Sequence, residues 1–387
     1  MQQVPTWTPG TGEPFEEYDR LRGQCPVAFS DSYGGFWSLL THAEVSRAAR
    51  DWKTFSSGKG SPFVEFPDFA RSIPINLDPP EHGGIRKLLS RYLVPGRIAQ
   101  LEPRIRAFVT EHMDELLDGG RGDGLVVARP LPQRALAAAL NMPDDAYLMF
   151  VAKMTKIAEA GDDAKAANEL LRNLWTDEVV ELVESRRARP LDPDTDLMTG
   201  VITAEIDGKP IPDADCVAIG IQLFAAGGET TTSGIMNSLY YVATQPEVQR
   251  RLRAEPGLIP AAVEEFLRMR PPLHHLARTT TGEATVGACP IPAGSRVALN
   301  YAAANRDARV FPEPDSCDID RTPNRHLTFG FGPHTCLGAP LARLEIKLVL
   351  EAVLGRTTWI ELDGDPVELI KVNLASGFSS LPLTFTA

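Results

Sequence analysis

Cys336 is the residue whose neighbours most clearly indicate chemistry, because it follows two glycines and a proline and precedes a third glycine in FGFGPHTCLG, residues 329–338. Glycine-rich backbone can turn amide N–H groups toward a sulfur, and a helix predicted over 337–355 places its positive end beside it. Both effects favour the thiolate, which is the form that ligates metals or acts as a nucleophile. Gly338 leaves room for a flat ligand to approach the backbone. An inert cysteine in a turn is the alternative interpretation of this segment alone.

A second candidate site is Gly227-Gly228-Glu229-Thr230, inside an apolar run that predicts a helix over 213–244. Each glycine in a helix interior costs about 1 kcal/mol relative to alanine, so the pair indicates a close approach of a ligand or a neighbour. One interpretation is a groove that admits O2, and the other is a kink or a tight helix crossing. A carboxylic acid beside a hydroxyl can pass protons through water.

Two further pairs have the spacing of one helix face. His82 and Arg86 follow Pro79-Pro80, a typical helix start, and an arginine suits a carboxylate because its planar fork donates two parallel hydrogen bonds. Glu265 and Arg268 stand three residues apart and can pair, although such a pair is most often exposed and contributes little to stability.

The elements that position these residues are mostly helices. Apolar residues recur at helical spacing over 97–117, 164–187, 213–244, 258–270 and 337–355. Strand patterns occur at 26–30 and 36–40, around the Asp207-Gly208 turn in 203–211, and at 275–280, 296–300 and 357–386. We therefore expect a mainly α fold with small peripheral β-sheets, and a single domain over residues 1–387.

Composition limits the possible partners. The chain has 387 residues with 39 Lys+Arg against 51 Asp+Glu, a net charge of −12, which argues against nucleic-acid and anionic-membrane binding. We find no signal peptide and no apolar run of about 18 residues, the length that a membrane-spanning helix needs. The five cysteines lack CxxC spacing, which favours reduced thiols and a cytoplasmic location.

The spacing Phe329-xx-Gly332-xxx-Cys336-x-Gly338 resembles the haem-binding signature of the cytochrome P450 monooxygenases. The resemblance implies the cytochrome P450 fold, with haem b between a long central helix and the cysteine-loop helix and with Cys336 as the axial iron ligand. It implies that Glu229 and Thr230 relay protons during O2 activation, and that Glu265 and Arg268 are buried behind the haem and hold the cysteine loop. The other residues that it assigns to the cofactor are His82, Arg86, Arg278, His334 and Gly338.

The sequence departs from the family pattern in FPEPDSCDIDR, residues 311–321. Ser316 stands where we expect the arginine that joins the Glu-x-x-Arg pair, and Cys317 where we expect phenylalanine. We therefore expect a different arrangement around Glu265 and assign Ser316 no part in it.

Within the family, residues 55–66, 73–81 and 374–383 look most like the camphor hydroxylase subfamily. No tyrosine lies between Tyr33 and Tyr92 to hydrogen-bond the ketone of camphor, so we expect another small apolar substrate, a terpenoid or a norisoprenoid such as an ionone. Matching segments predict an apolar pocket. Its residues are Phe63, Phe66, Phe69, Ala225, Ala226, His274, Leu374 and Ala375.

Electrons should come from a 2Fe–2S ferredoxin and its NADH-dependent reductase, since the resemblance shows no fused reductase. A basic patch could dock an acidic donor. Its candidate residues are Arg86, Lys87, Arg91, Arg343 and Lys347. A peroxide-driven enzyme and a haem sensor or carrier are the alternative functions, and the Glu229–Thr230 pair disfavours both. A structural helical protein with a chance cysteine motif is the third alternative.

Overall fold

The computed structural model describes residues 4–6, 14–61, 72–159, 176–369 and 376–386. Its central element is α11 (Asp213–Thr244), a helix of 32 residues. Acidic Asp213 and Asp215 favour its N-terminus through the helix dipole, and Pro246 follows its end. Because α11 is buried on most of its sides, its apolar residues extend around the helix rather than along one stripe.

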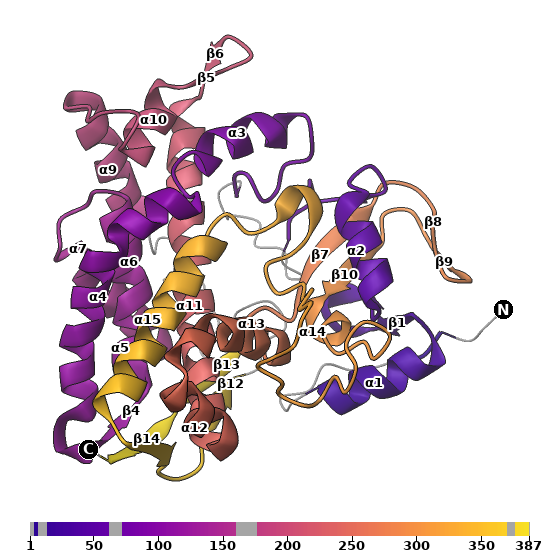
Figure 1. Cartoon of the computed structure of the whole chain (residues 1–387). Helices are drawn as coiled ribbons and strands as arrows, with labels where there is room; N and C mark the ends of the chain where they lie inside the picture. The colour runs from indigo at the N-terminus through magenta and orange to yellow at the C-terminus, as the bar shows by residue number, and fades with distance from the viewer. Residues whose placement is uncertain (1–3, 7–13, 62–71, 160–175, 370–375, 387) are drawn as a thin grey trace.

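The helices gather on the left of Figure 1, around α11. α15 (Ala339–Arg356) packs against α11 and α4 (Pro95–Leu117), and α6 (Pro130–Ala139), α9 (Thr176–Ala188) and α13 (Ile259–Met269) also contact α11. The other α-helices are α1 (Phe15–Gln24), α2 (His42–Arg50), α3 (Glu81–Ser90), α5 (Leu125–Ala128), α7 (Ala146–Glu159), α10 (Leu197–Thr203), α12 (Pro246–Ala254) and α14 (Tyr301–Ala304).

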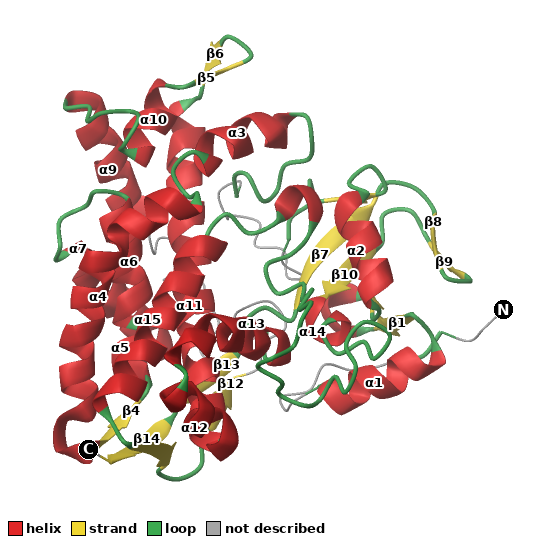
Figure 2. Cartoon of the chain, in the orientation of Figure 1, coloured by secondary structure: helices red, strands yellow, loops and turns green. Residues whose placement is uncertain are grey.

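The strands lie at the edges of this helical body (Figure 2). One sheet has the order β1 (Val27–Ser30), β2 (Phe36–Leu39), β10 (Arg296–Asn300), β7 (His275–Thr280) and β3 (Phe55–Ser56). A second contains β11 (Trp359–Leu362), β14 (Pro382–Thr386) and β4 (Arg121–Asp123). Three hairpin-like pairs are β5 (Glu205–Ile206) with β6 (Lys209–Pro210), β8 (Ala284–Val286) with β9 (Cys289–Ile291), and β12 (Val367–Leu369) with β13 (Gly377–Ser380).

The predicted fold class is confirmed. The helix predicted over 213–244 has those bounds, and α4, α13 and α15 lie within two residues of their predicted limits. Asp207 and Gly208 have positive φ angles of 52° and 74°, as the predicted hairpin turn requires. Of the helix predicted over 164–187, residues 164–175 lie outside the described part.

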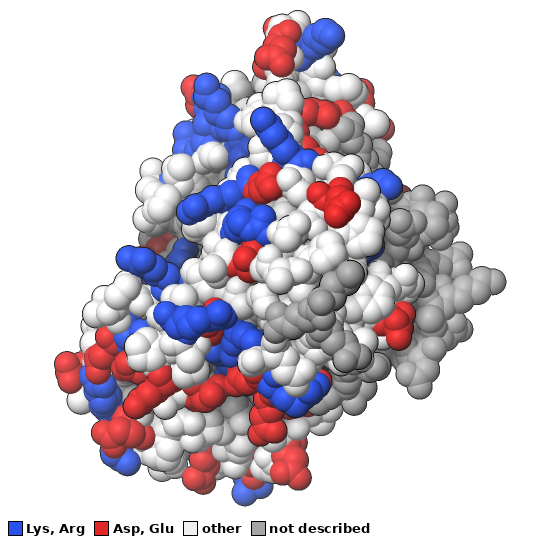
Figure 3. All heavy atoms as spheres, turned by 90° about the vertical axis from the view of Figure 1, so that its right-hand side faces the viewer, with Lys and Arg blue, Asp and Glu red and all other residues white. Residues whose placement is uncertain are grey.

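Two features of the surface bear on partners. Among the described residues, none of the helices is both long and apolar enough to cross a membrane. On the face shown in Figure 3, basic side chains gather across the upper and middle part, whereas acidic side chains line the lower part.

Candidate functional site

The loop that carries Cys336 requires glycine at two positions. Gly330 and Gly332 have φ angles of 69° and 72°, a region that disfavours residues with a side chain. A Cβ at Gly332 would also lie 2.9 Å from the carbonyl oxygen of Ala49. The backbone N–H of Cys336 donates to the carbonyl of Phe329 over 2.7 Å, and α15 begins three residues later.

The sulfur of Cys336 faces donors on its own backbone. The residue has exposed surface, and the nearby protein desolvates its sulfur enough to raise the pKa of the thiol. The backbone N–H groups of Gly338 and Ala339 and the charge of Arg86 act in the opposite direction and stabilise the thiolate. Within the described residues, no group of three His, Cys, Asp or Glu could hold a metal ion.

Four donor groups meet beside this loop. His82 and Arg86 lie one turn apart on α3, Arg278 on β7 and His334 in the cysteine loop, and the rings of the two histidines stand 4.2 Å apart. Burial, followed by the charge of Arg86, lowers the pKa of His82 to about 4. Burial, followed by the charge of Arg278, lowers that of His334 to about 3. Both histidines are thus neutral at pH 7, and the positive charge belongs to the two arginines.

This cluster fits the carboxylates of a bound group. Arg278 is 2% exposed, and burial lowers the pKa of its guanidinium. The Nε2 atom of His82 is buried with no hydrogen-bond partner among the described residues. Asp78 is the nearby carboxylate, but its oxygens accept from Ser56 Oγ and the N–H of Ser57. Arg278 also donates to the carbonyl of Ala277, and His334 Nε2 bonds with Ser57 Oγ, so in the described part of the chain His82 Nε2 is the atom left without a partner. An unpartnered buried nitrogen beside two arginines is costly in the protein alone and is typical of an anion site.

The predicted proton relay lies on one turn of α11. Thr230 Oγ donates to the carbonyl of Ala226 over 2.6 Å, so the hydroxyl oxygen keeps lone pairs that can accept a hydrogen bond. Ala226 is exposed, although Phe224 and Gly228 on the same helix are buried. Glu229 is half-buried beside Thr230. The structure therefore places the acid, the hydroxyl and an unpacked stretch of helix together.

The adjacent glycines mark a tight helix crossing. A Cβ at Gly228 would lie 1.9 Å from Nε2 of Gln133 on α6, and one at Gly227 would lie 3.4 Å from Leu136. The crossing thus accounts for the need for glycine at 228.

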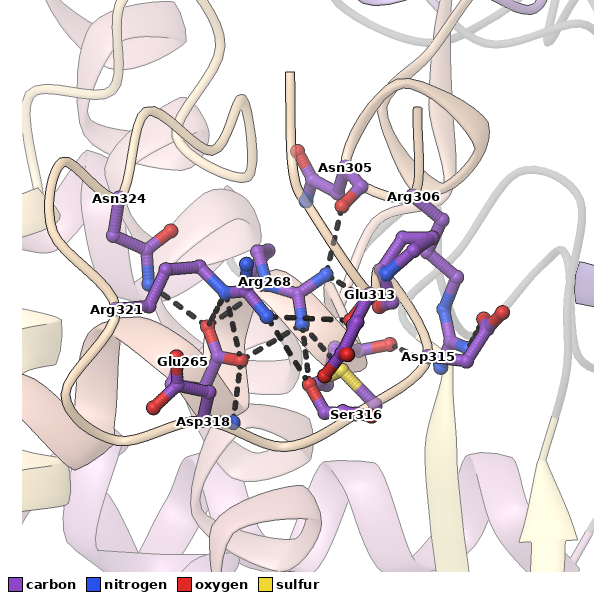
Figure 4. Close-up of polar contacts among 12 residues, drawn as sticks. Glu265, Arg268, Asn305, Arg306, Glu313, Asp315, Ser316, Asp318, Arg321 and Asn324 are labelled. Carbon is purple, nitrogen blue, oxygen red and sulfur yellow. Dashed lines mark hydrogen bonds and ion pairs between the residues drawn. The ribbon is translucent and has the colours of Figure 1, made fainter. Parts of the chain in front are cut away.

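The Glu-x-x-Arg pair is buried rather than exposed. Glu265 and Arg268 on α13 are both 0% exposed, and Arg268 donates to both carboxylate oxygens over 2.8 Å. Arg268 also donates to the carbonyls of Asn305, Pro314 and Ser316 (Figure 4). The surface-pair interpretation is wrong.

The third partner of this pair is Arg321. Its Nε donates to both oxygens of Glu265 over 3.1 and 3.2 Å, from five residues beyond Ser316 (Figure 4). Asn324 Nδ2 and the N–H of Asp318 donate to the same carboxylate. Ser316 contributes its backbone carbonyl alone. We call these groups (Glu265, Arg268, Asp318, Arg321 and Asn324) the Glu265 cluster.

The Glu265 cluster is joined to the cysteine loop through Asn305. Its Oδ1 accepts from the N–H of Leu327 over 2.7 Å, and its Nδ2 donates to Thr328 Oγ. Thr328 Oγ in turn donates to the carbonyl of Leu267 on α13. The chain therefore enters Phe329 from a segment held by buried hydrogen bonds.

The predicted substrate pocket is described only in part. Phe63, Phe66, Phe69, Leu374 and Ala375 lie outside the described residues. Ala225 and Ala226 lie on α11, directly before the proton-relay turn.

His274 lies in different surroundings. Its ring is 5.9 Å from that of Phe15 on α1, in a cavity of about 10 Å³ that Asn237 and Arg270 also line. Burial lowers its pKa to about 3, so the ring is neutral. Its contact with substrate stays a prediction.

Comparisons with known proteins identify the family. Residues 136–386 match the family described as Cytochrome P450. The chain is 33% identical over 384 residues to Cytochrome P450 109 of Bacillus spizizenii, covering 96% of this chain and 92% of that protein. It is 31% identical over 398 residues to Cytochrome P450-terp of a Pseudomonas species, covering 95% and 92%. The chain belongs to the cytochrome P450 family and is a cytochrome P450 monooxygenase.

Solved structures agree with this assignment. The structure of CYP108D1 from Novosphingobium aromaticivorans matches with a TM-score of 0.85 at 30% identity, over 96% of this chain and 94% of that chain. CYP109E1 from Bacillus megaterium, in complex with testosterone, matches with a TM-score of 0.84 at 27% identity, over 97% and 100%.

Two contributors to the site escaped the sequence analysis. Arg321 was missed because it lies five residues beyond the expected position, Ser316. Its contact with Glu265 depends on the path of the loop. Gln133 stands beside Arg134 in the otherwise apolar stretch 131–139, and nothing in the sequence indicates that it meets Gly228.

Proposed function

We propose that this monooxygenase hydroxylates a small apolar molecule, a terpenoid or a norisoprenoid of the size of an ionone. The observation that carries the proposal is the turn Ala226–Thr230, where a hydroxyl and a carboxylic acid stand beside two small apolar residues. Ala225 and Ala226 leave space for substrate and offer it no hydrogen bond. Relatives include Cytochrome P450-terp and an erythromycin C-12 hydroxylase, so the family alone does not narrow the substrate. A likeness to the camphor hydroxylase subfamily forms part of the proposal.

The four donor groups beside the cysteine loop, together with Cys336, fit haem b. Cys336 would be the axial ligand, and Arg86, Arg278, His82 and His334 would bind the two propionates. A thiolate-ligated haem, when bound, supplies the O2-activating chemistry. The N–H groups of Gly338 and Ala339 favour the thiolate against the burial that raises the pKa of Cys336, and Arg86, which donates to the carbonyl of Thr335, holds the loop against α3.

The proton needed for O2 activation would pass along the Ala226–Thr230 turn. Glu229 would release the proton to water, and Thr230 Oγ would accept a hydrogen bond from that water while its own hydrogen stays directed at the carbonyl of Ala226. Thr230→Ala removes the acceptor, so NADH consumption should continue while peroxide replaces product. Product formation with intact coupling in this variant would disprove the relay.

Thiolate ligation is tested by the absorption spectrum of the dithionite-reduced protein under carbon monoxide. We expect a strongly red-shifted Soret band that Cys336→Ser lacks. The same band in Cys336→Ser would overturn the assignment of the ligand.

We further propose a ferredoxin as electron donor, docked near α3. Four of the five candidate basic residues are already engaged in the protein. Arg91 pairs with Asp194 over 2.9 Å, Arg343 pairs with Glu264 over 2.6 Å, Lys347 lies 3.5 Å from Glu351, and Arg86 donates to a carbonyl.

Lys87 therefore gives the cleanest test. Lys87→Glu should raise the KM for a 2Fe–2S ferredoxin and reduce its salt dependence. Arg343→Glu is less informative, because it also breaks the pair with Glu264 and the contact of its guanidinium with Phe329 at 4.3 Å. Unchanged kinetics in Lys87→Glu and Arg91→Glu would exclude this surface.

A further inference from the structure

Gln133 occupies the space of a missing side chain on α11. A Cβ at Gly228 would lie 1.9 Å from the Nε2 atom and 3.1 Å from the Cδ atom of Gln133. Gln133 is 3% exposed and Gly228 is buried, so this contact lies inside the helix crossing, away from solvent. The amide therefore lies directly against the helix backbone, one residue before Glu229.

The amide and the Thr230 hydroxyl act on opposite faces of the same turn. Successive helix residues rotate by about 100°, which places Gly228 about 200° from both Ala226 and Thr230. On the outer face, the bond from Thr230 Oγ to the carbonyl of Ala226 draws that carbonyl outward, as such i to i−4 bonds do when they bend helices. On the inner face, Gln133 supports the middle of the turn. Both contacts therefore act on the turn that carries the predicted proton relay.

Packing alone does not explain why this residue is polar. The Oε1 atom of Gln133 is buried with no hydrogen-bond partner among the described residues, which is costly. A methionine of similar volume would fill the crossing without that cost. One turn further along the same seam, Thr232 Oγ donates to the carbonyl of Ala128 over 2.9 Å, so a polar group there is satisfied.

We infer that Gln133 is a positioning residue for O2 activation. Its amide, seated against Gly228, sets the geometry of the Ala226–Thr230 turn and so decides how much of the consumed O2 reaches product rather than peroxide. The inference deepens the proposed function and rests on the proton relay at Thr230. It places no atom of Gln133 in contact with substrate or cofactor.

The alternative is that Gln133 only fills the helix crossing. The two roles predict different responses to Gln133→Met. A space-filling role predicts unchanged or higher thermal stability and unchanged coupling. A positioning role predicts that stability is kept while coupling is lost.

The test compares the holoenzyme with Gln133→Met, Gln133→Ala and two controls. Thr232→Val removes a hydrogen bond from the same seam without touching Gly228, and it should lower stability while leaving coupling intact. Thr230→Ala is the positive control for loss of the relay. The measurements are peroxide released per NADH, without substrate and with β-ionone as probe, and amide hydrogen exchange at residues 226–230.

In Gln133→Met we expect peroxide per NADH to rise and amide hydrogen exchange at 226–230 to accelerate, each by up to about tenfold. This limit lies below the loss of reaction rate, about a hundredfold, that a displacement of 1 Å at a reacting group can cause. Gly228→Ala should give the same changes, and combining it with Gln133→Met should not add to them. Unchanged hydrogen exchange and peroxide release in both Gln133 variants would overturn the inference. No rise in peroxide in Thr230→Ala would instead overturn the relay, and the exchange data would still decide the role of Gln133.

Discussion

Replacing Arg321 by alanine tests the correction at the Glu265 cluster. Arg321 is 7% exposed along its side chain, and the carboxylate that it contacts is fully buried, so solvent screens the interaction little. Glu265 keeps Arg268 and two N–H donors after the substitution, which makes the loss smaller than the roughly 3–5 kcal/mol of an orphaned buried charge. One charge-assisted hydrogen bond contributes about 1.5–3 kcal/mol.

We therefore expect Arg321→Ala to lower the free energy of unfolding by about 2–3 kcal/mol. Arg268→Ala should cost more, because Arg268 is 0% exposed and donates to Glu265 over 2.8 Å, whereas the distances from Arg321 are 3.1 and 3.2 Å. Ser316→Ala is the matched control and should change stability by less than about 0.5 kcal/mol, since Ser316 contributes only its backbone carbonyl. Urea unfolding of the holoprotein, followed together with loss of the thiolate-type carbon monoxide spectrum, measures all three variants.

The pH dependence gives an independent check. Burial works to raise the pKa of Glu265, but the hydrogen bonds and charges of Arg268, Asp318 N–H and Arg321 outweigh it, and the pKa lies below the ordinary 4.5. A depressed pKa contributes stability that is present above pH 4.5 and is lost as the pH falls through the lowered value. The difference between wild type and Arg321→Ala should shrink under acid conditions. An equal loss of stability in Ser316→Ala and Arg321→Ala would refute this account of the cluster.

Three other predictions concern buried titratable groups. Glu345 on α15 is 1% exposed, and burial raises its pKa well above 4.5, so it stays protonated in the native state. Stability should therefore fall as the pH rises above 4.5, by up to about 1.4 kcal/mol per pH unit, and urea titration of Glu345→Gln should show a flatter profile. Arg278→Leu should stabilise the apoprotein, because it removes a buried charge, and should speed haem transfer to apomyoglobin by about 10–100-fold; slower transfer would exclude Arg278 from propionate binding. His274→Ala should change the distribution of hydroxylated products if the ring reaches substrate, and an unchanged distribution would confine His274 to the cavity beside Phe15.

The sequence predicted the local parts of the site well. The bounds of α11, the helical phase of His82 and Arg86, and the glycine loop before Cys336 all follow from short-range rules of propensity and steric strain. Arg321 could not be predicted, because its contact with Glu265 depends on the path of the chain over residues 312–324, which has no periodic pattern. Gln133 escaped for a related reason, since its effect depends on where two distant helices cross.

The Glu265 cluster also limits how this region of the chain can change during evolution or engineering. Arg268 and Arg321 donate mainly to backbone carbonyls, at Asn305, Pro312, Glu313, Pro314 and Ser316. Every residue type carries a carbonyl, so side chains in 312–316 can vary where they make no contact of their own, as at Ser316; Asp315, which pairs with Arg306 over 2.6 Å, and Glu313, with a φ of 47°, are the exceptions. An insertion or deletion there would instead move all the later carbonyls away from their donors. This stretch should therefore tolerate many substitutions but no change in length.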